Sequence, residues 1–142
     1  MKILVINGPN LNMISRRDET QYSAFNIEQI IALLEKEFPS IQFTSFQTNI
    51  EGEIVTKIQQ TQLEFDGLII NPGAYSHTSI AIMDALEICK VPKIEVHLSH
   101  LANREDYRQN LLTAKSTDGY ISGFKENSYL AAAYLLKKLI SN

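Results

Sequence analysis

The chain has 142 residues, of which 44% are hydrophobic, and its formal net charge is −3. This length suits one well-packed domain over residues 1–142 and is short for two. No basic run marks a nucleic-acid-binding surface, and no apolar run approaches the roughly 20 residues of a membrane span. The single cysteine, Cys89, cannot form an intrachain disulfide. With no signal-peptide pattern after Met1, we expect a cytoplasmic protein that binds neither nucleic acid nor membrane.

Short β-branched runs alternate with helical patterns along the chain, which is typical of βαβ units and a parallel sheet. Right-handed crossovers favour a doubly wound α/β sheet of order 2-1-3-4-5 with helices on both faces. In a sheet of this order, ligands bind beyond the carboxyl ends of the strands, at the switch between strands 1 and 3. The five strands are predicted at residues 2–6, 41–46, 67–71, 93–97 and 120–123.

Four helices are predicted between and after these strands. The first, over residues 27–38, has the clearest signal, because Asn26 can cap it and Gln29 occupies the capping-box position. Its apolar residues recur with helical spacing, so one face should pack against the sheet. The other helices are predicted around residues 50–58 and over residues 80–89 and 129–140.

Polar side chains follow three of the predicted strands. Asn10 lies in the turn after the first strand, and Asn71 ends the third. Glu95 and His97 close the fourth strand, where the two-residue period places them on the same face. Asparagine after a strand is an ordinary turn former when it occurs alone. Three such positions at one edge of the sheet indicate a ligand site.

Four segments carry a family resemblance that extends over nearly the whole chain. They are similar, in the same order, to those of type II 3-dehydroquinate dehydratase. The resemblance implies a flavodoxin-like fold and the dehydration of 3-dehydroquinate to 3-dehydroshikimate without a cofactor. It also implies trimers assembled into a homododecamer. The segments are Asn7 to Asn12, Arg17 to Tyr22, Asn71 to Ser79, and Glu95 to Ser99 followed by Arg104 and Arg108.

By this similarity, Tyr22 is the base that removes a proton next to the substrate ketone. An ordinary tyrosine is protonated at neutral pH, and a contacting cation favours the ionised form. Arg17 is the expected cation, with Arg16 or Arg104 as a helper. Residues 13–20 have little apolar content, so we expect them to close over the substrate as a mobile lid. The alternative is a solvated loop of self-neutralising charges, with Tyr22 as an amphipathic residue at its edge.

His97 matches the family's general acid, which protonates the C1 hydroxyl as it leaves. Glu95 could orient this histidine or favour its charged form. Asn10 matches the residue that stabilises the enolate through a water molecule. The alternative for His97 is a hydrogen-bonded histidine at a strand end.

The remaining expected site residues bind the substrate. His77 is predicted at the start of the third helix, whose positive end should keep the imidazole neutral. The spacing of Arg104 and Arg108 predicts that they share one helical face. By resemblance, the substrate hydroxyls are bound by Asn71, His77 and Arg108, and the carboxylate by the backbone amides of Leu98 and Ser99.

The helix over residues 80–89 is apolar around more of its circumference than contact with one sheet requires. This excess predicts a contact between subunits. By resemblance, Asp84 reaches the neighbouring subunit's site and binds a substrate hydroxyl there. The competing interpretation is a helix buried deep in its own domain.

Several residues depart from the family's usual pattern, although none removes a proposed catalytic group. They leave open a degenerate, noncatalytic member, and the sequence does not distinguish aromatic biosynthesis from quinate breakdown. The departures are Ser15, Asp18, Glu19, Ala102, Asn103, Leu111 and residues 125–128.

The residues disfavour two other functions. A flavodoxin-like module that binds FMN or another phosphate-bearing ligand is disfavoured, because Pro9 removes an N–H from the loop after the first strand. Metal-dependent hydrolysis by Glu95, His77, His97 and His100 lacks a recognisable ligand motif, so no metal is expected.

Overall fold

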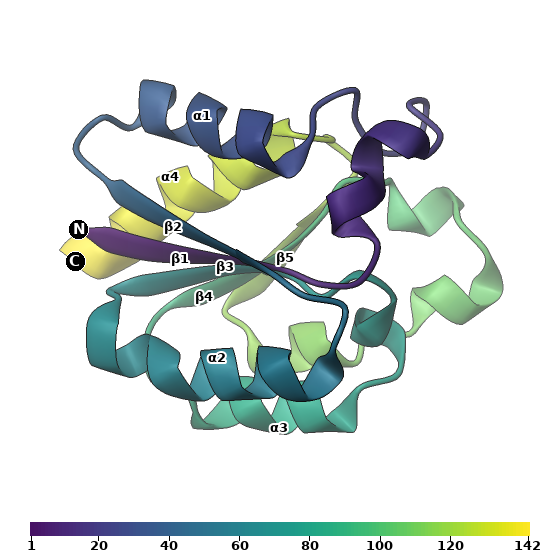
Figure 1. Cartoon of the computed structure of the whole chain (residues 1–142). Coiled ribbons are helices and arrows are strands. Elements are labelled where there is room, and N and C mark those ends of the chain that lie inside the picture. Colours follow the sequence, from purple (N-terminus) through teal and green to yellow (C-terminus); the bar gives the residue numbers. More distant parts are fainter.

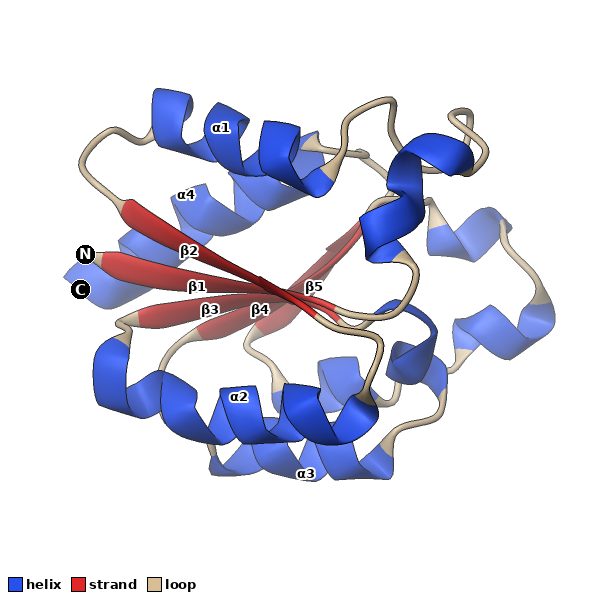
Figure 2. Ribbon diagram, viewed as in Figure 1, coloured by secondary structure: helices blue, strands red, loops and turns tan.

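The computed structural model describes all 142 residues, and its centre is a five-stranded parallel sheet. The strands are β1 (Lys2–Asn7), β2 (Gln42–Gln47), β3 (Gly67–Asn71), β4 (Lys93–His97) and β5 (Gly119–Ser122). Their order, β2-β1-β3-β4-β5, confirms the predicted topology. The α-helices are α1 (Ile27–Glu37), α2 (Glu51–Glu64), α3 (Ile80–Ile88) and α4 (Asn127–Ser141). Figures 1 and 2 show α1 and α4 over one face of the sheet and α2 and α3 over the other.

Side chains of β1 alternate between two apolar cores. Ile3 and Val5 belong to a buried cluster shared with α1 and α4, whereas Leu4 and Ile6 belong to one shared with α2 and α3. This arrangement follows from the two-residue period of a strand that is covered on both faces. The parallel register between β1 and β3 sets Asn7 opposite Asn71. Two amide side chains therefore meet at the carboxyl edge of the sheet.

The predicted capping box of α1 is present. The Asn26 side chain accepts a hydrogen bond of 2.8 Å from the Gln29 amide, and the Gln29 side chain accepts one of 2.9 Å from the Asn26 amide. Two N–H groups at the helix start are thereby satisfied. This local chemistry explains why the α1 boundary could be placed from the sequence.

Five short 3-10 helices in the connections were not predicted. They have too few residues to show a hydrophobic period, and each is held by i to i+3 hydrogen bonds. The segments at residues 11–16 and 101–109 stand at the end of the sheet opposite the two chain termini (Figure 1). The five helices are Leu11–Arg16, Gly73–His77, Leu101–Asn103, Asp106–Gln109 and Thr113–Ser116.

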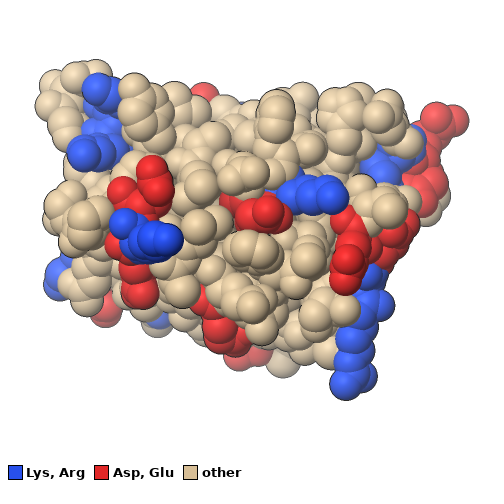
Figure 3. Space-filling view, turned by 90° about the horizontal axis from the view of Figure 1, so that it is seen from above, with Lys and Arg blue, Asp and Glu red and all other residues tan.

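On the face above α1 and α4, basic and acidic side chains are interspersed rather than gathered by sign (Figure 3). None of the helices combines the length and the apolar content that crossing a bilayer requires.

Candidate active site

A cavity of about 90 Å³ opens at the carboxyl edge of the sheet. Its walls come from the loop after β1, the 3-10 helix after β3 and the segment after β4. The structure thus brings together groups that are far apart in the sequence, as expected for a parallel sheet. The predicted site residues that line the cavity are Asn10, Arg17, Tyr22, Asn71, His77, His97, Leu98, Ser99 and Arg108, together with Arg104.

Three of the residues considered from the sequence lie outside this lining. Glu95 is fully buried behind His97. Asp84 is exposed on α3, away from the cavity of its own chain. Arg16 is exposed and lines no part of the cavity, so Arg104 is the better placed of the two expected helpers.

Tyr22 is buried and faces two guanidinium groups. The Cζ atom of Arg17 lies 3.7 Å from the centroid of the Tyr22 ring, and an Nη atom of Arg17 donates a hydrogen bond to the phenol oxygen. The Cζ atom of Arg104 lies 5.3 Å from the same centroid. Both distances are within the range of cation–π attraction. Two segments of the chain therefore bring positive charge against one phenol.

Arg104 and Arg108 do not lie on one helix, so that expectation was wrong. Arg104 follows the 3-10 helix Leu101–Asn103, and Arg108 belongs to the separate 3-10 helix Asp106–Gln109. Glu105, between them, accepts contacts of 3.3 Å from Arg104 Nε and 3.0 Å from Arg108 Nε. Its own backbone amide, followed by the two arginines, holds the pKa of Glu105 below its usual value. The two arginines therefore share one carboxylate partner and both line the cavity, although they belong to separate segments.

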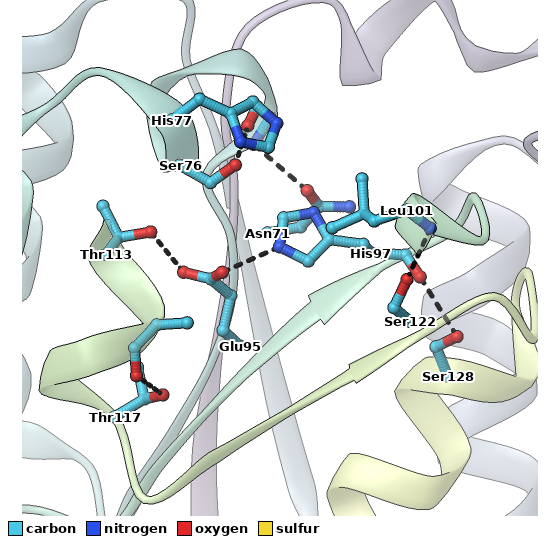
Figure 4. A network of polar contacts seen from close by, with 12 residues as sticks. Asn71, Ser76, His77, Glu95, His97, Leu101, Thr113, Thr117, Ser122 and Ser128 are labelled. Carbon is cyan, nitrogen blue, oxygen red and sulfur yellow. Dashed lines mark hydrogen bonds and ion pairs between the residues drawn. The ribbon is translucent and has the colours of Figure 1, made fainter. Parts of the chain in front are cut away.

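Glu95 and His97 share one face of β4, as predicted. The His97 Nε2 atom lies 2.7 Å from Glu95 Oε2 (Figure 4). The other carboxylate oxygen, Oε1, accepts a hydrogen bond from the Thr113 hydroxyl. Thr113 was missed because it lies 18 residues from Glu95, in a connection with no periodic pattern. The contact with Glu95 uses one ring nitrogen of His97 and leaves Nδ1 for the cavity.

His77 ends the 3-10 helix Gly73–His77, two residues before the N-cap of α3. The N-cap of α3 is Ser79, whose hydroxyl accepts a hydrogen bond from the Ile82 amide. His77 Nδ1 lies 2.8 Å from the Asn110 carbonyl oxygen, which can only accept, so Nδ1 carries the proton. Burial lowers the pKa of His77 against the opposing effect of that hydrogen bond. The expected neutral imidazole is therefore favoured by desolvation rather than by a helix end.

A buried hydrogen-bonded triad lies beneath the cavity. The Tyr129 hydroxyl of α4 donates to the Asn7 side chain and accepts a hydrogen bond of 3.1 Å from Asn71 Nδ2. Asn71 Oδ1 accepts another from the Gly73 amide. Burial raises the pKa of the Tyr129 phenol well above its usual range, so it remains a neutral donor. Tyr129 was missed because a tyrosine within an apolar helical pattern gives no sign of a polar role.

Two backbone amides and one asparagine side chain at the cavity are free to bind a ligand. The N–H groups of Leu98 and Ser99 donate no hydrogen bond within the chain. Asn10 adopts a left-handed backbone conformation with φ of 68°, which asparagine tolerates better than most residues. The backbone N–H of Asn10 donates to the Asn49 side chain, whereas the Asn10 side chain makes no hydrogen bond within the chain. No three or more His, Cys, Asp or Glu side chains gather in a way that could hold a metal ion.

The fold and the cavity define an α/β protein with a doubly wound sheet, whose candidate active site holds a phenol, an imidazole, arginines and free amides. The profile of the family described as "Dehydroquinase class II" matches residues 1–137. The chain belongs to this family, which confirms the resemblance seen in the sequence.

Named relatives are similar over nearly their whole length. The 3-dehydroquinate dehydratase of Thermotoga petrophila is 47% identical over 140 residues, covering 97% of this chain and 96% of the relative. That of Clostridium perfringens is 46% identical over 145 residues, covering 100% and 99%. The crystal structure of type II dehydroquinase from Butyrivibrio crossotus matches with a TM-score of 0.92 at 40% identity, covering 96% of this chain and 97% of that one.

Proposed function

We propose that this chain dehydrates 3-dehydroquinate to 3-dehydroshikimate through an enolate, with Tyr22 as the base and His97 as the acid. The base takes a proton from the carbon next to the ketone. The enolate then reforms the carbonyl and expels the C1 hydroxyl, which leaves as water with a proton from the acid. The observation that carries the proposal is the contact of Arg17 with the Tyr22 hydroxyl in the cavity that His97 also lines.

The arginines supply what a tyrosine base requires. At neutral pH only about one ordinary tyrosine in a thousand is ionised, so the anion must be stabilised. Contact with an opposite charge favours an ionised group by about 1.4 to 4 kcal/mol. Arg17 donates directly to the phenol oxygen of Tyr22, and Arg104 adds a second positive charge at the ring.

The pair of Glu95 and His97 supplies the acid. In the cationic form of His97, Nε2–H donates to the buried Glu95 carboxylate, and Nδ1–H is directed to the departing hydroxyl. Opposite charge on Glu95 favours this doubly protonated form. After the proton is transferred, the neutral imidazole retains its hydrogen bond to Glu95.

The other groups at the cavity position the substrate. We assign the enolate oxygen to Asn10 through a water molecule, and the substrate carboxylate to the free amides of Leu98 and Ser99. The ring hydroxyls are assigned to Asn71, His77 and Arg108. With Nδ1 of His77 bonded to the Asn110 carbonyl, its Nε2 is an acceptor for a substrate hydroxyl.

The lid is proposed to move in its second half. Leu11 and Ile14 are buried in the core under α1 and α4, and they anchor the first part of the loop. Residues 15–20 carry no such anchor. Asp18 makes only local hydrogen bonds, which its side chain accepts from Thr20 and its carbonyl accepts from the Gln21 and Tyr22 amides. Closure of this short segment over a bound ligand would exclude water from the phenolate.

Asp84 is proposed to complete the site of a neighbouring subunit in a trimer, with trimers assembled into a dodecamer. Ile80, Asp84 and Ile88 are spaced four residues apart and therefore lie along one stripe of α3. The two isoleucines are 61% and 60% exposed, so burial of the helix within its own domain does not account for them. An aspartate between two exposed isoleucines suits a contact that also delivers a carboxylate.

The test is an ultraviolet assay for the conjugated product formed from 3-dehydroquinate. The proposal predicts steady product formation by the purified protein without added cofactor. A folded protein that forms no product would identify a noncatalytic family member.

A further inference from the structure

We propose that Thr113 is a positioning residue for the acid, because it holds the Glu95 carboxylate in the orientation that accepts the His97 hydrogen bond. This inference rests on the proposed function. It concerns a residue on the connection between β4 and β5, outside the set that lines the cavity.

The Glu95 carboxylate depends on two donors. It is 0% exposed, and its side chain makes two hydrogen bonds within the chain. Oε2 pairs with His97 and Oε1 with Thr113, and Figure 4 shows the two partners approaching Glu95 from opposite sides. A buried carboxylate that loses one of two hydrogen bonds has a large desolvation cost left uncompensated. Thr113 therefore contributes to fixing the plane of the Glu95 carboxylate.

Thr113 is itself held in place. It is fully buried, and it begins the 3-10 helix Thr113–Ser116. The preceding residue, Leu112, donates a backbone hydrogen bond of 2.9 Å to the Ser76 carbonyl. The backbone next to Thr113 is thus hydrogen-bonded to the 3-10 helix Gly73–His77, which also carries His77. This contact places the donor to Glu95 and the His77 ring relative to one another.

The consequence reaches the acid through the charge on Glu95. A Glu95 carboxyl that rotated or took up a proton would no longer support a doubly protonated His97. The other charged or titratable groups that line the cavity with His97 are Tyr22, His77, Arg17, Arg104 and Arg108, and the ring centroid of His77 lies 6.4 Å from that of His97. The arginines oppose positive charge on His97, and Glu95 is the carboxylate in direct contact with it.

The experiment compares Thr113→Val, which keeps the shape but loses the hydroxyl, with Thr113→Ser, which keeps the hydroxyl. The matched control is Thr61→Val, because Thr61 is equally buried but donates only to the Lys57 carbonyl within α2. Hydrogen bonds to charged groups are strong enough that we expect Thr113→Val to lower kcat about 10- to 100-fold. KM should stay near the wild-type value, and the falling limb of the pH–rate profile should move to lower pH.

Thr113→Ser should recover most of kcat, and Thr61→Val should leave kcat unchanged. A Thr113→Val enzyme with wild-type kcat and pH profile overturns the inference while the proposed function stands. A wild-type protein without turnover refutes the proposed function and the inference together. If the valine variant does not fold, Thr113→Ala read against Thr113→Ser decides by the same two measurements.

Discussion

Arg17 contacts Tyr22 in two ways, with its Cζ atom 3.7 Å from the ring centroid and a guanidinium nitrogen donating to the hydroxyl. The two residues are separated by five positions in one loop. A base and its activating cation therefore belong to the same loop. Arg17 lies in the short segment that is proposed to move, and Tyr22 is buried in the core just after it. This relationship is the basis of the proposed chemistry.

Removing the cation should impair the base. Arg17→Ala is expected to lower kcat about 10- to 1000-fold at neutral pH, because contact with an opposite charge favours an ionised group by this factor. The loss should diminish as pH rises, since the phenolate then forms without help. Steady-state rates across the pH range measure this. Arg16→Ala, in the exposed neighbour, serves as the control. A loss that is equal at every pH would assign Arg17 to another task.

The imidazole of His77 should remain neutral under mildly acidic conditions. Burial lowers its pKa below the usual value of 6.5, so less than half of it should be protonated at pH 6.5. Because the unfolded chain binds this proton more readily, the associated stability is present above pH 6.5 and is lost as pH falls through the folded pKa. Nuclear magnetic resonance of the histidine rings, assigned with His77→Gln, measures the titration. Half-protonation above pH 6.5 would contradict the role of burial.

Shared sites can be detected by mixing inactive subunits. Asp84→Ala and Tyr22→Phe should each be inactive, and mixed oligomers should regain part of the wild-type rate, because some sites then combine an intact Tyr22 with an intact Asp84. Native mass spectrometry verifies that the subunits have mixed. Mixed oligomers that remain inactive would show that Asp84 does not serve a neighbour's site.

The capping box of α1 should contribute measurably to stability. Loss of an N-cap side chain costs about 1 kcal/mol. For a chain of this size Asn26→Ala should therefore lower Tm by about 2 to 4 °C. Asn127→Ala is the matched control, because Asn127 is an exposed asparagine at the start of α4 that makes no side-chain hydrogen bond. Equal shifts in the two variants would show that the cap is not the cause.

The fold could be predicted because its signals are local and periodic. β3 and β4 begin and end at the predicted residues, and α1 follows from its cap and its apolar stripe. The 3-10 helices could not be predicted in this way, since segments of three to six residues are too short to establish a period. Arg104 and Arg108 were wrongly placed on one helix for that reason.

The residues of the candidate site likewise fall into some that the sequence could locate and others that it could not. Asn10, Asn71 and His97 could be located because parallel strands bring their carboxyl ends to one edge. Thr113 and Tyr129 could not, because each acts through a contact distant in sequence and lies in a segment without a polar pattern. The order of strands predicts which loops meet. It does not predict which buried hydroxyl supports which carboxylate or amide.

The most direct measurement is turnover and ligand binding by Tyr22→Phe. This variant keeps the ring beneath Arg17 and removes only the oxygen that accepts the proton. General bases contribute about 100- to 10,000-fold to catalysis, so kcat should fall by at least this factor. Calorimetric titration with 3-dehydroquinate should give a Kd near the wild-type value of KM. Near-normal turnover by Tyr22→Phe would contradict the assignment of Tyr22 as the base.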